Sequence, residues 1–385
     1  MSDLRELLAD VAGEAKVYDV TGRAVRAAGR RSRARRYTPI AALLVVVLVV
    51  VAVWVPLASR GGSLVAGPVR WLPALVAVPK KVPPVLTEHQ RVGRGSLLFR
   101  VRDWPGMVLL TENGRHYTVP DAVSISPDGR WLLLGENDRL MVQDLRDGGR
   151  QQLSTRDPDD LSLRWSSNGG WLVIGPGPGA VMAPAGDRSI ALIEAPSWRP
   201  KLISRSSQRA ILLAAVDSGN FVTYEVEADG EPSLPPPGWL SLYRPNGGPE
   251  AVSLATAAKA LRPDENLDPE HQVLGDGSTV MIRTWRKWSE GNATGPVPAD
   301  ILVLDGLSAA VHRRIELPTP SFGSDGTGDY RELAAAAPEG ILVWHFQRSA
   351  PVELELMDRA TGKLTVATRA TGDRIEHVYP RGYSR

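Results

Sequence analysis

Turn sequences that recur at a fixed interval are the feature that most constrains how this chain folds. SPDG occupies Ser126–Gly129, SSNG occupies Ser166–Gly169 and SSQR occupies Ser206–Arg209, so each turn begins 40 residues after the one before. Asp, Asn, Ser and Gly are typical of tight turns between strands. A repeat of about 40–45 residues that holds several strands predicts a ring of four-stranded sheets, a β-propeller.

Short apolar runs fill the sequence from Arg91 onward. Runs such as GMVLLT, RWLLLG, GWLVIG and DILVLD are rich in Val, Ile, Leu and Trp, and most are bounded by Gly, Asp, Asn or Pro. Such runs predict β-strands joined by hairpins. Helical spacing is nearly confined to Val252–Leu261 and Arg331–Ala337. We therefore predict an all-β domain, with a pair of two-sheet sandwiches as the competing fold.

The first repeat resembles a known family. SPDGRWL at Ser126–Leu132 and DLRDGG at Asp144–Gly149 resemble the blades of TolB-like and WD-repeat-like β-propellers, and the later units match more loosely. At about 42 residues per blade, Arg91–Tyr383 should form about seven four-stranded blades, within a range of six to eight. The resemblance implies a fold and not an activity.

A stretch of 20 residues without a charge, Thr38–Leu57, predicts one transmembrane helix. As a helix it is long enough to cross the roughly 30 Å hydrocarbon core of a bilayer. The arginines that precede it should stay in the cytoplasm by the positive-inside rule; they are Arg30, Arg31, Arg33, Arg35 and Arg36. A cleaved signal peptide is the alternative, but the run is longer than the usual apolar region of about 7–15 residues and begins late.

These signals divide the chain into four parts. We predict a cytoplasmic helical and basic segment at 1–37, a transmembrane helix at 38–57, a Pro-rich stalk at 58–90 and a propeller outside the cytoplasm at 91–385. Within the stalk, Leu72–Val78 is apolar and is expected either on the outer membrane surface or over the edge of the propeller. This layout is similar to that of single-pass propeller proteins of the plasma membrane in actinobacteria.

Charge and composition limit the partners. Residues 1–37 hold nine basic and five acidic residues, whereas the whole chain has a formal net charge of only +2. The basic segment should meet the anionic lipids of the inner leaflet. The nearly neutral remainder lacks the basic excess of a nucleic-acid-binding domain, so no nucleic acid is expected as a partner. Cysteine is absent, which excludes disulfides and thiolate chemistry.

Motifs for catalysis or metal binding are not evident in the sequence. DENLDPE at Asp264–Glu270 has acidic residues at calcium-loop spacing, but Pro269 and Gly275 stand where Gly and Glu are needed. We interpret it as a solvated loop. The six histidines show no i, i+4 spacing, and no G-x-S-x-G elbow is present. We therefore predict no catalytic residue, no cofactor and no metal site, and hence no enzyme.

Tryptophan and basic residues near two insertions are the candidate binding residues. They are Trp239, Trp285, Arg286, Lys287 and Trp288. Aromatic and arginine side chains often anchor partners at interfaces. The expected function is a non-catalytic module that binds an unknown protein or glycan outside the cytoplasm. Two alternatives stay open: a transmembrane regulator whose cytoplasmic segment binds a signalling or transcription protein, similar to an anti-sigma factor, and an enzyme with its site in the propeller channel.

Overall fold

The computed structural model describes residues 69–383, except 155–159, 177–188, 206–208, 227–238, 246–249, 254, 268–272, 291–292, 307, 323–327, 348–349 and 372–373. In this part of the chain the strands form six sheets, which we call blades 1 to 6. The predicted cytoplasmic segment, its arginines and the predicted span at Thr38–Leu57 lie outside the described residues. Within the described ranges, no helix combines the length and the hydropathy that a membrane crossing requires.

Blades 1 to 4 contain four strands each, named in order from the inner to the outer strand. Blade 1 is formed by β27 (Ile375–Pro380), β2 (Gly95–Val101), β3 (Met107–Thr111) and β4 (His116–Val119). Blade 2 is formed by β5 (Ala122–Ile125), β6 (Trp131–Glu136), β7 (Arg139–Asp144) and β8 (Arg150–Ser154). Blade 3 is formed by β9 (Leu161–Trp165), β10 (Trp171–Pro176), β11 (Ser189–Glu194) and β12 (Arg199–Arg205). Blade 4 is formed by β13 (Arg209–Ala215), β14 (Phe221–Val226), β15 (Trp239–Tyr243) and β16 (Glu250–Ser253).

Blades 5 and 6 carry additional strands. Blade 5 is formed by β18 (Val273–Asp276), β19 (Thr279–Glu290), β20 (Ala293–Asp305) and β21 (Val311–Ile315), and β17 (Glu265–Leu267) also pairs with β19. Blade 6 is formed by β23 (Gly328–Ala337), β24 (Gly340–Gln347), β25 (Ala350–Met357) and β26 (Leu364–Thr371), with β22 (Ser321–Phe322) on β23 and β1 (Leu75–Ala77) on β26. The short helix α5 (Ala255–Lys259) follows blade 4 within the segment where helical spacing predicts a helix.

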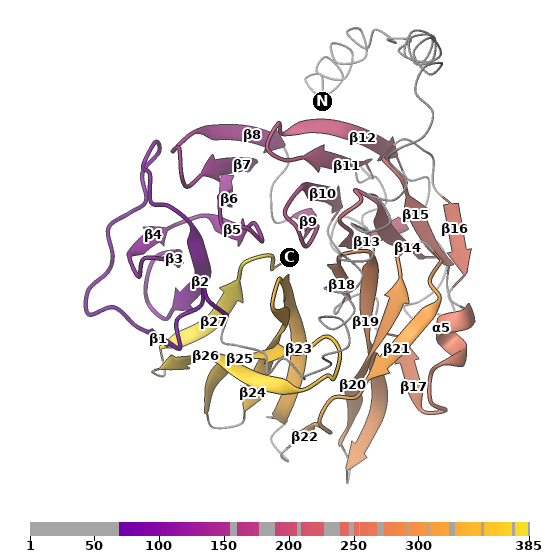
Figure 1. Cartoon of the computed structure of the whole chain (residues 1–385). Coiled ribbons are helices and arrows are strands. Elements are labelled where there is room, and N and C mark those ends of the chain that lie inside the picture. Colours follow the sequence, from indigo (N-terminus) through magenta and orange to yellow (C-terminus); the bar gives the residue numbers. More distant parts are fainter. Residues whose placement is uncertain are drawn as a thin grey trace, which may run out of the picture. The chain divides into compact units, whose positions relative to one another are not determined.

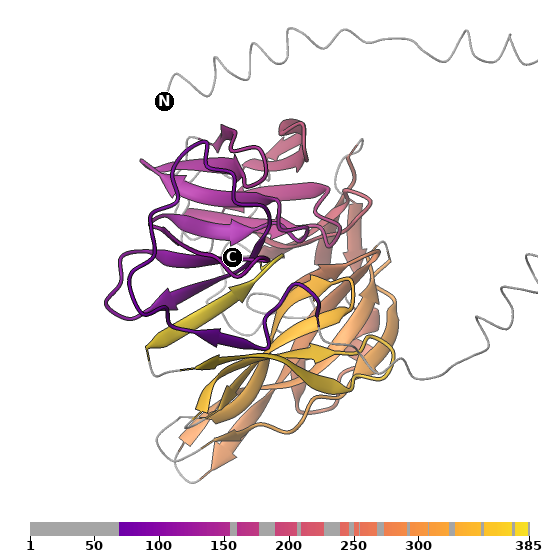
Figure 2. The ribbon, with the colours of Figure 1, turned by 60° about the vertical axis from the view of Figure 1, so that its left-hand side comes forward.

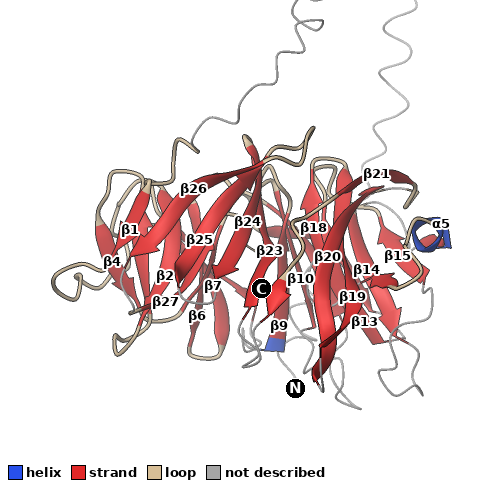
Figure 3. Ribbon diagram, turned by 90° about the horizontal axis from the view of Figure 1, so that it is seen from below, coloured by secondary structure: helices blue, strands red, loops and turns tan. Residues whose placement is uncertain are grey.

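The blades stand in a ring, and both faces of each sheet are buried against a neighbour. Figure 1 shows the inner strands around the middle of the ring, and Figure 3 shows the strands from below. In β6, Trp131 and Leu133 pack toward blade 3, whereas Leu132 and Leu134 pack toward blade 1, because side chains alternate along a strand. One apolar cluster lies between each pair of neighbouring blades, including blades 6 and 1. Burial on both faces explains why the strand runs are almost continuously apolar.

The two ends of the propeller sequence close the ring in blade 1. The C-terminal strand β27 pairs antiparallel with β2, with Leu98 opposite Tyr379, and Figure 2 shows the yellow β27 beside the indigo β2. The indole nitrogen of Trp344 in blade 6 donates a hydrogen bond to the Val378 carbonyl in β27, at 2.6 Å. Blade 1 therefore holds both ends of the propeller.

The number of blades is six, at the lower end of the predicted range, rather than seven. In chain order, the six inner strands begin at Ala122, Leu161, Arg209, Val273, Gly328 and Ile375, so their spacing varies from 39 to 64 residues. Blades 3 to 6 contain insertions, so six blades account for a length of chain that would form seven blades of about 42 residues. The predicted helical segment Arg331–Ala337 is also wrong, because it belongs to the inner strand β23, where small alanines fit near the middle of the ring.

A segment before blade 1, residues 69–92, runs along the propeller edge; we call it the strap. Its strand β1 pairs parallel with β26, with Val76 opposite Ala370. Val69 and Leu72 are buried between blades 6 and 1, and Leu86 is buried between blades 1 and 2. Over residues 69–90 the chain therefore covers the edge of the propeller instead of forming a free spacer, and Leu72–Val78 takes the second of its two expected positions.

Candidate functional site

A cavity of about 340 Å³ opens between the strap, blade 1 and blade 2; we call it the strap groove. Its lining residues are Val85, Leu86, Thr87 and Glu88 of the strap, Val119 of blade 1, Pro120 and Asp121 between blades 1 and 2, and Leu134, Glu136, Gln143 and Arg150 of blade 2. Ligand sites commonly combine apolar walls with a few placed polar groups. The lining residues include no histidine, so the groove has no nitrogen ligand for a zinc-type ion.

Backbone pairing fixes the strap as one wall of the groove. The Leu86 amide donates to the Thr118 carbonyl, and the Thr118 amide donates to the Pro84 carbonyl, both at 2.9 Å. Proline cannot donate from its own nitrogen, so the strap joins β4 through carbonyls and the Leu86 amide. The strap then reaches blade 2, where the Val92 amide donates to the Leu145 carbonyl at 2.8 Å.

A chain of polar groups forms the side of the groove on blade 2. The Arg150 guanidinium pairs with Glu136 at 2.9 Å and donates to the Gln143 side-chain oxygen at 2.8 Å. The Gln143 amide in turn donates to the Thr87 carbonyl of the strap at 3.2 Å. The Arg150 side chain is only 11% exposed, and its Nε has no hydrogen-bond partner among the described residues.

The charges of the groove favour a cationic ligand. Its lining residues carry three carboxylates, Glu88, Asp121 and Glu136, and one guanidinium, Arg150. Glu88 and Asp121 are exposed, whereas Leu86, Val119 and Leu134 are buried beside them. An acidic rim beside apolar walls suits an amphipathic molecule with a positive group.

The sequence-predicted binding residues lie elsewhere, on two blades. Trp239 begins β15 of blade 4, whereas Trp285, Arg286, Lys287 and Trp288 are consecutive in β19 of blade 5. Trp285 and Arg286 are half-buried, and the Trp285 indole nitrogen donates to the Leu267 carbonyl at 3.1 Å. Consecutive strand residues point to opposite faces, so Trp285 and Arg286 do not share one face. The side chains of Trp239, Lys287 and Trp288 lie outside the described residues.

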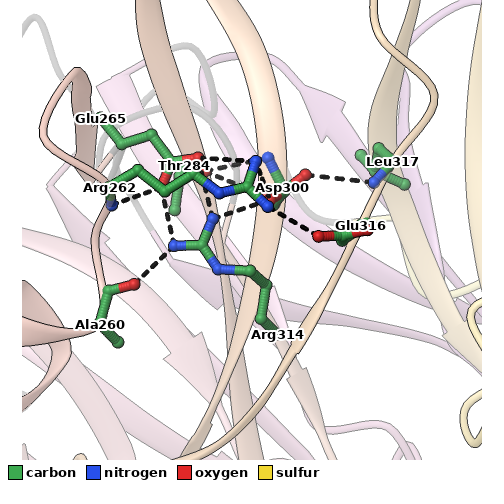
Figure 4. A network of polar contacts seen from close by, with 8 residues as sticks. All are labelled: Ala260, Arg262, Glu265, Thr284, Asp300, Arg314, Glu316 and Leu317. Carbon is green, nitrogen blue, oxygen red and sulfur yellow. Dashed lines mark hydrogen bonds and ion pairs between the residues drawn. The ribbon is translucent and has the colours of Figure 1, made fainter.

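A buried ionic network fastens β17 to blade 5 (Figure 4). Arg314 on β21 pairs with Glu265 on β17 and with Asp300 on β20, each at 2.7 Å. The Glu265 side chain is 1% exposed, so the second carboxylate of the predicted solvated loop DENLDPE is buried, whereas Asp264 before it is exposed. Burial alone would raise the pKa of Glu265, but hydrogen bonds from the Arg314 side chain and the Arg262 amide outweigh it and lower the pKa.

Sequence reasoning missed the strap groove because its residues are far apart in the chain. The Glu136–Arg150 pair spans 14 residues, and the Gln143–Thr87 hydrogen bond spans 56. The available sequence signal was a charged residue at the end of β6, Glu136, and one at the start of β8, Arg150. Only the position of the strap places Glu88 in the same groove.

Comparisons with known proteins return propeller structures. No family model matches the sequence, and no curated protein matches it. Similar solved structures include the β-propeller domain of the Trilobed protease from Pyrococcus furiosus (TM-score 0.41, 14% identity, 68% of this chain and 73% of that chain). A putative TolB from Agrobacterium tumefaciens gives a TM-score of 0.42 at 14% identity, covering 75% of this chain and 98% of that chain. The acylaminoacyl peptidase of Pyrococcus horikoshii gives a TM-score of 0.40 at 15% identity, covering 70% of this chain and 43% of that chain.

TolB is thus among the similar structures, as the resemblance of the first repeat led us to expect. The neighbours also include peptidases, and at these identities and TM-scores they support no statement about activity or ligand. The assignment of six blades rests on the sheets themselves.

Proposed function

We propose that this chain is a membrane-anchored β-propeller that binds an amphipathic, cationic ligand outside the cytoplasm and does not catalyse a reaction. The observation that carries the proposal is the strap groove, a cavity of about 340 Å³ with an acidic rim and apolar walls. Support for the anchor comes from the uncharged stretch Thr38–Leu57 and the arginines before it. Fold alone does not decide function, so the proposal rests on this site.

The position of the strap suggests how occupancy of the groove could be transmitted. Residues 85–88 line the groove, and the same segment continues toward the predicted span. A ligand in the groove contacts the strap directly and lies beside the Gln143–Thr87 hydrogen bond. Binding would therefore stabilise the arrangement in which the strap is held on blades 1 and 2. A ligand that bound equally well with the strap released would not change the position of the strap.

The topology can be tested with a reporter. Alkaline phosphatase fused after Arg385 should be active in cells, because the positive-inside rule places the C-terminal domain outside the cytoplasm. The matched fusion after Tyr37, before the predicted span, should be inactive. Activity only from a cytoplasmic reporter placed after Arg385 would overturn the proposed anchor.

The groove can be tested by reversing the charge of its rim. The double variant Glu88→Lys, Asp121→Lys should lose binding to synthetic peptides that combine Lys or Arg with apolar residues, measured by fluorescence anisotropy on purified full-length protein. Both side chains are exposed, so the free energy of unfolding should change by less than about 0.5 kcal/mol. The control Glu250→Lys, Asp264→Lys reverses two exposed charges on other blades and should leave binding intact.

Two outcomes of the peptide experiment would contradict the assignment. Undiminished binding in the rim variant would exclude the groove, and loss in Trp288→Ala, Arg286→Ala instead would move the site to β19, where the sequence predicts it. Hydrolytic turnover that depends on one Asp or His of the purified protein would overturn the non-catalytic function altogether.

A further inference from the structure

We propose that blade 6 holds a binding site for one divalent ion of the zinc type, formed by His345, Glu353 and Glu355. These three side chains are the group of potential metal ligands that lies together in the described part of the chain. His345 on β24 is directly opposite Glu353 on β25, and Glu355 lies two residues further along the same strand. Residues two apart share a face, so all three project from one face of the sheet.

The separations of the ligand atoms suit a single ion. Nδ1 of His345 lies 3.2 Å from a Glu355 oxygen and 3.7 Å from a Glu353 oxygen. In a tetrahedral zinc site with bonds of about 2.0–2.1 Å, neighbouring ligand atoms lie roughly 3.3 Å apart. All three ligand atoms lie within 4.8 Å of one another, so side-chain adjustments can bring them onto one ion, and the fourth position is left for water.

A second layer of polar groups orients each ligand through its other atom. Nε2 of His345 lies 2.8 Å from an Asp329 oxygen, the arrangement by which metal-binding histidines are usually held. The second oxygen of Glu353 accepts a hydrogen bond from Arg369 at 2.6 Å, and that of Glu355 accepts one from Arg331 at 2.7 Å. One nitrogen of His345 and one oxygen of each glutamate face one another, and this Glu355 oxygen also accepts a second hydrogen bond from Arg331.

Burial and charge give a reason for an ion at this place. The His345 and Glu355 side chains are 9% and 8% exposed, and they continue the face on which Val343 packs between blades 5 and 6. The most buried charges of the cluster are two carboxylates, Glu353 and Glu355, and one guanidinium, Arg331, so a neutral imidazole leaves one negative charge in excess. Because unbalanced charge is costly in a buried place, a cation would be favoured there.

Competing donors limit the affinity. The Gln347 side-chain nitrogen lies 3.1 Å from His345 Nδ1. One Arg331 nitrogen lies 3.4 Å from the same Nδ1 and 3.3 Å from the Glu355 ligand oxygen. Both must withdraw when an ion binds. A nitrogen ligand beside two carboxylates favours zinc over magnesium, which prefers oxygen ligands and retains its waters.

The test is a zinc titration of purified, chelator-treated full-length protein by calorimetry, with thermal unfolding as a second measurement. One zinc per chain should bind, and the melting temperature should rise with zinc concentration because the ion binds the folded state. Asp329→Asn should weaken the affinity about 10–100-fold, since Asp329 only orients His345. His345→Gln should abolish the binding, and the control His312→Gln, at an exposed histidine, should not change it.

Several results would overturn the site. They are the absence of zinc binding in the unaltered protein, an unchanged affinity in Asp329→Asn, and an equal loss in His312→Gln, which would indicate surface histidines. An equal rise of the melting temperature with magnesium would also contradict a zinc-type site. If His345→Gln does not fold, Asp329→Asn still decides the question, because its side chain is 46% exposed.

Discussion

Replacing Arg314 by methionine should lower the free energy of unfolding by about 3–5 kcal/mol, the usual cost of removing one partner from a buried ion pair. The guanidinium of Arg314 donates to Glu265, to Asp300 and to the Ala260 carbonyl, at 2.6 to 2.7 Å (Figure 4). Methionine keeps much of the apolar stem, so the loss reports on the charge. Urea unfolding followed by tryptophan fluorescence would measure the loss of stability. An unchanged dependence of the free energy of unfolding on urea concentration would show that the variant does not alter the compactness of the folded or unfolded state.

The matched control is Arg262→Met, in the same network. Arg262 is 47% exposed and makes its shortest contact, 2.7 Å, with Glu316, which is 74% exposed. Exposed pairs contribute about 0–1 kcal/mol, so this variant should lose little. Equal losses of stability in the two variants would contradict the expectation. They would mean that the buried partners Glu265 and Asp300 do not make the Arg314 contacts stronger than those of the exposed Arg262.

The pH dependence of the Arg314→Met effect follows from the lowered pKa of Glu265. A carboxyl whose pKa is lower in the folded state stabilises the protein above its unfolded pKa of about 4.3, and this contribution disappears as the pH falls through the folded pKa. Without Arg314, the largest cause that lowers the pKa of Glu265 is gone while the effect of burial stays, so this pKa should be higher than in the unaltered protein. The stability difference between the two proteins should therefore be full where Glu265 is ionised in both, shrink as the pH falls through the higher pKa of the variant, and stop shrinking below the lowered pKa of the unaltered protein. A difference that is constant from pH 7 to pH 3 would contradict the assigned pairing.

Local turn chemistry explains how far the fold could be predicted. In blades 2 and 3 the predicted turns join the inner strand to the next one, and Gly129 and Gly169 have φ of 72° and 71°, a conformation that glycine adopts easily. In blade 4 the corresponding turn is at Val216–Gly219, where the Gly219 amide donates to the Val216 carbonyl. Of the predicted turn at Ser206–Arg209, residues 206–208 lie outside the described residues, and Arg209 begins β13. The regular 40-residue interval therefore ends after two blades, and extrapolating it gave one blade too many.

Long-range contacts explain what could not be predicted. Burial of Val69, Leu72 and Val76 depends on β26, about 300 residues later in the sequence, so the prolines of this segment indicated only an extended chain. The cluster around His345 is similar, because its potential metal ligands lie on two strands of a hairpin and show no fixed sequence spacing. By contrast, Trp131 follows a predicted turn, and its burial between blades could be expected from the sequence.

Replacing Trp131 by alanine should cost about 3–5 kcal/mol, as expected for a large side chain removed from a packed core. Trp131 is 8% exposed, and its ring contacts that of Trp198 edge-to-face at 4.9 Å between blades 2 and 3. The Arg130 guanidinium covers the ring at 4.4 Å and adds a cation–π contribution. Guanidinium unfolding of the purified protein would measure the loss.

Trp104→Ala is the control for Trp131, because Trp104 is only half-buried and its ring lies 5.6 Å from the Arg374 guanidinium. This variant should lose clearly less stability, since part of the Trp104 ring already contacts water. A cost within about 0.5 kcal/mol for Trp131→Ala would mean that this ring behaves as a surface residue. The contact between blades 2 and 3 would then have to be held by Leu133, Leu163 and Leu172, each fully buried in the same cluster, without the tryptophan that the first repeat places there.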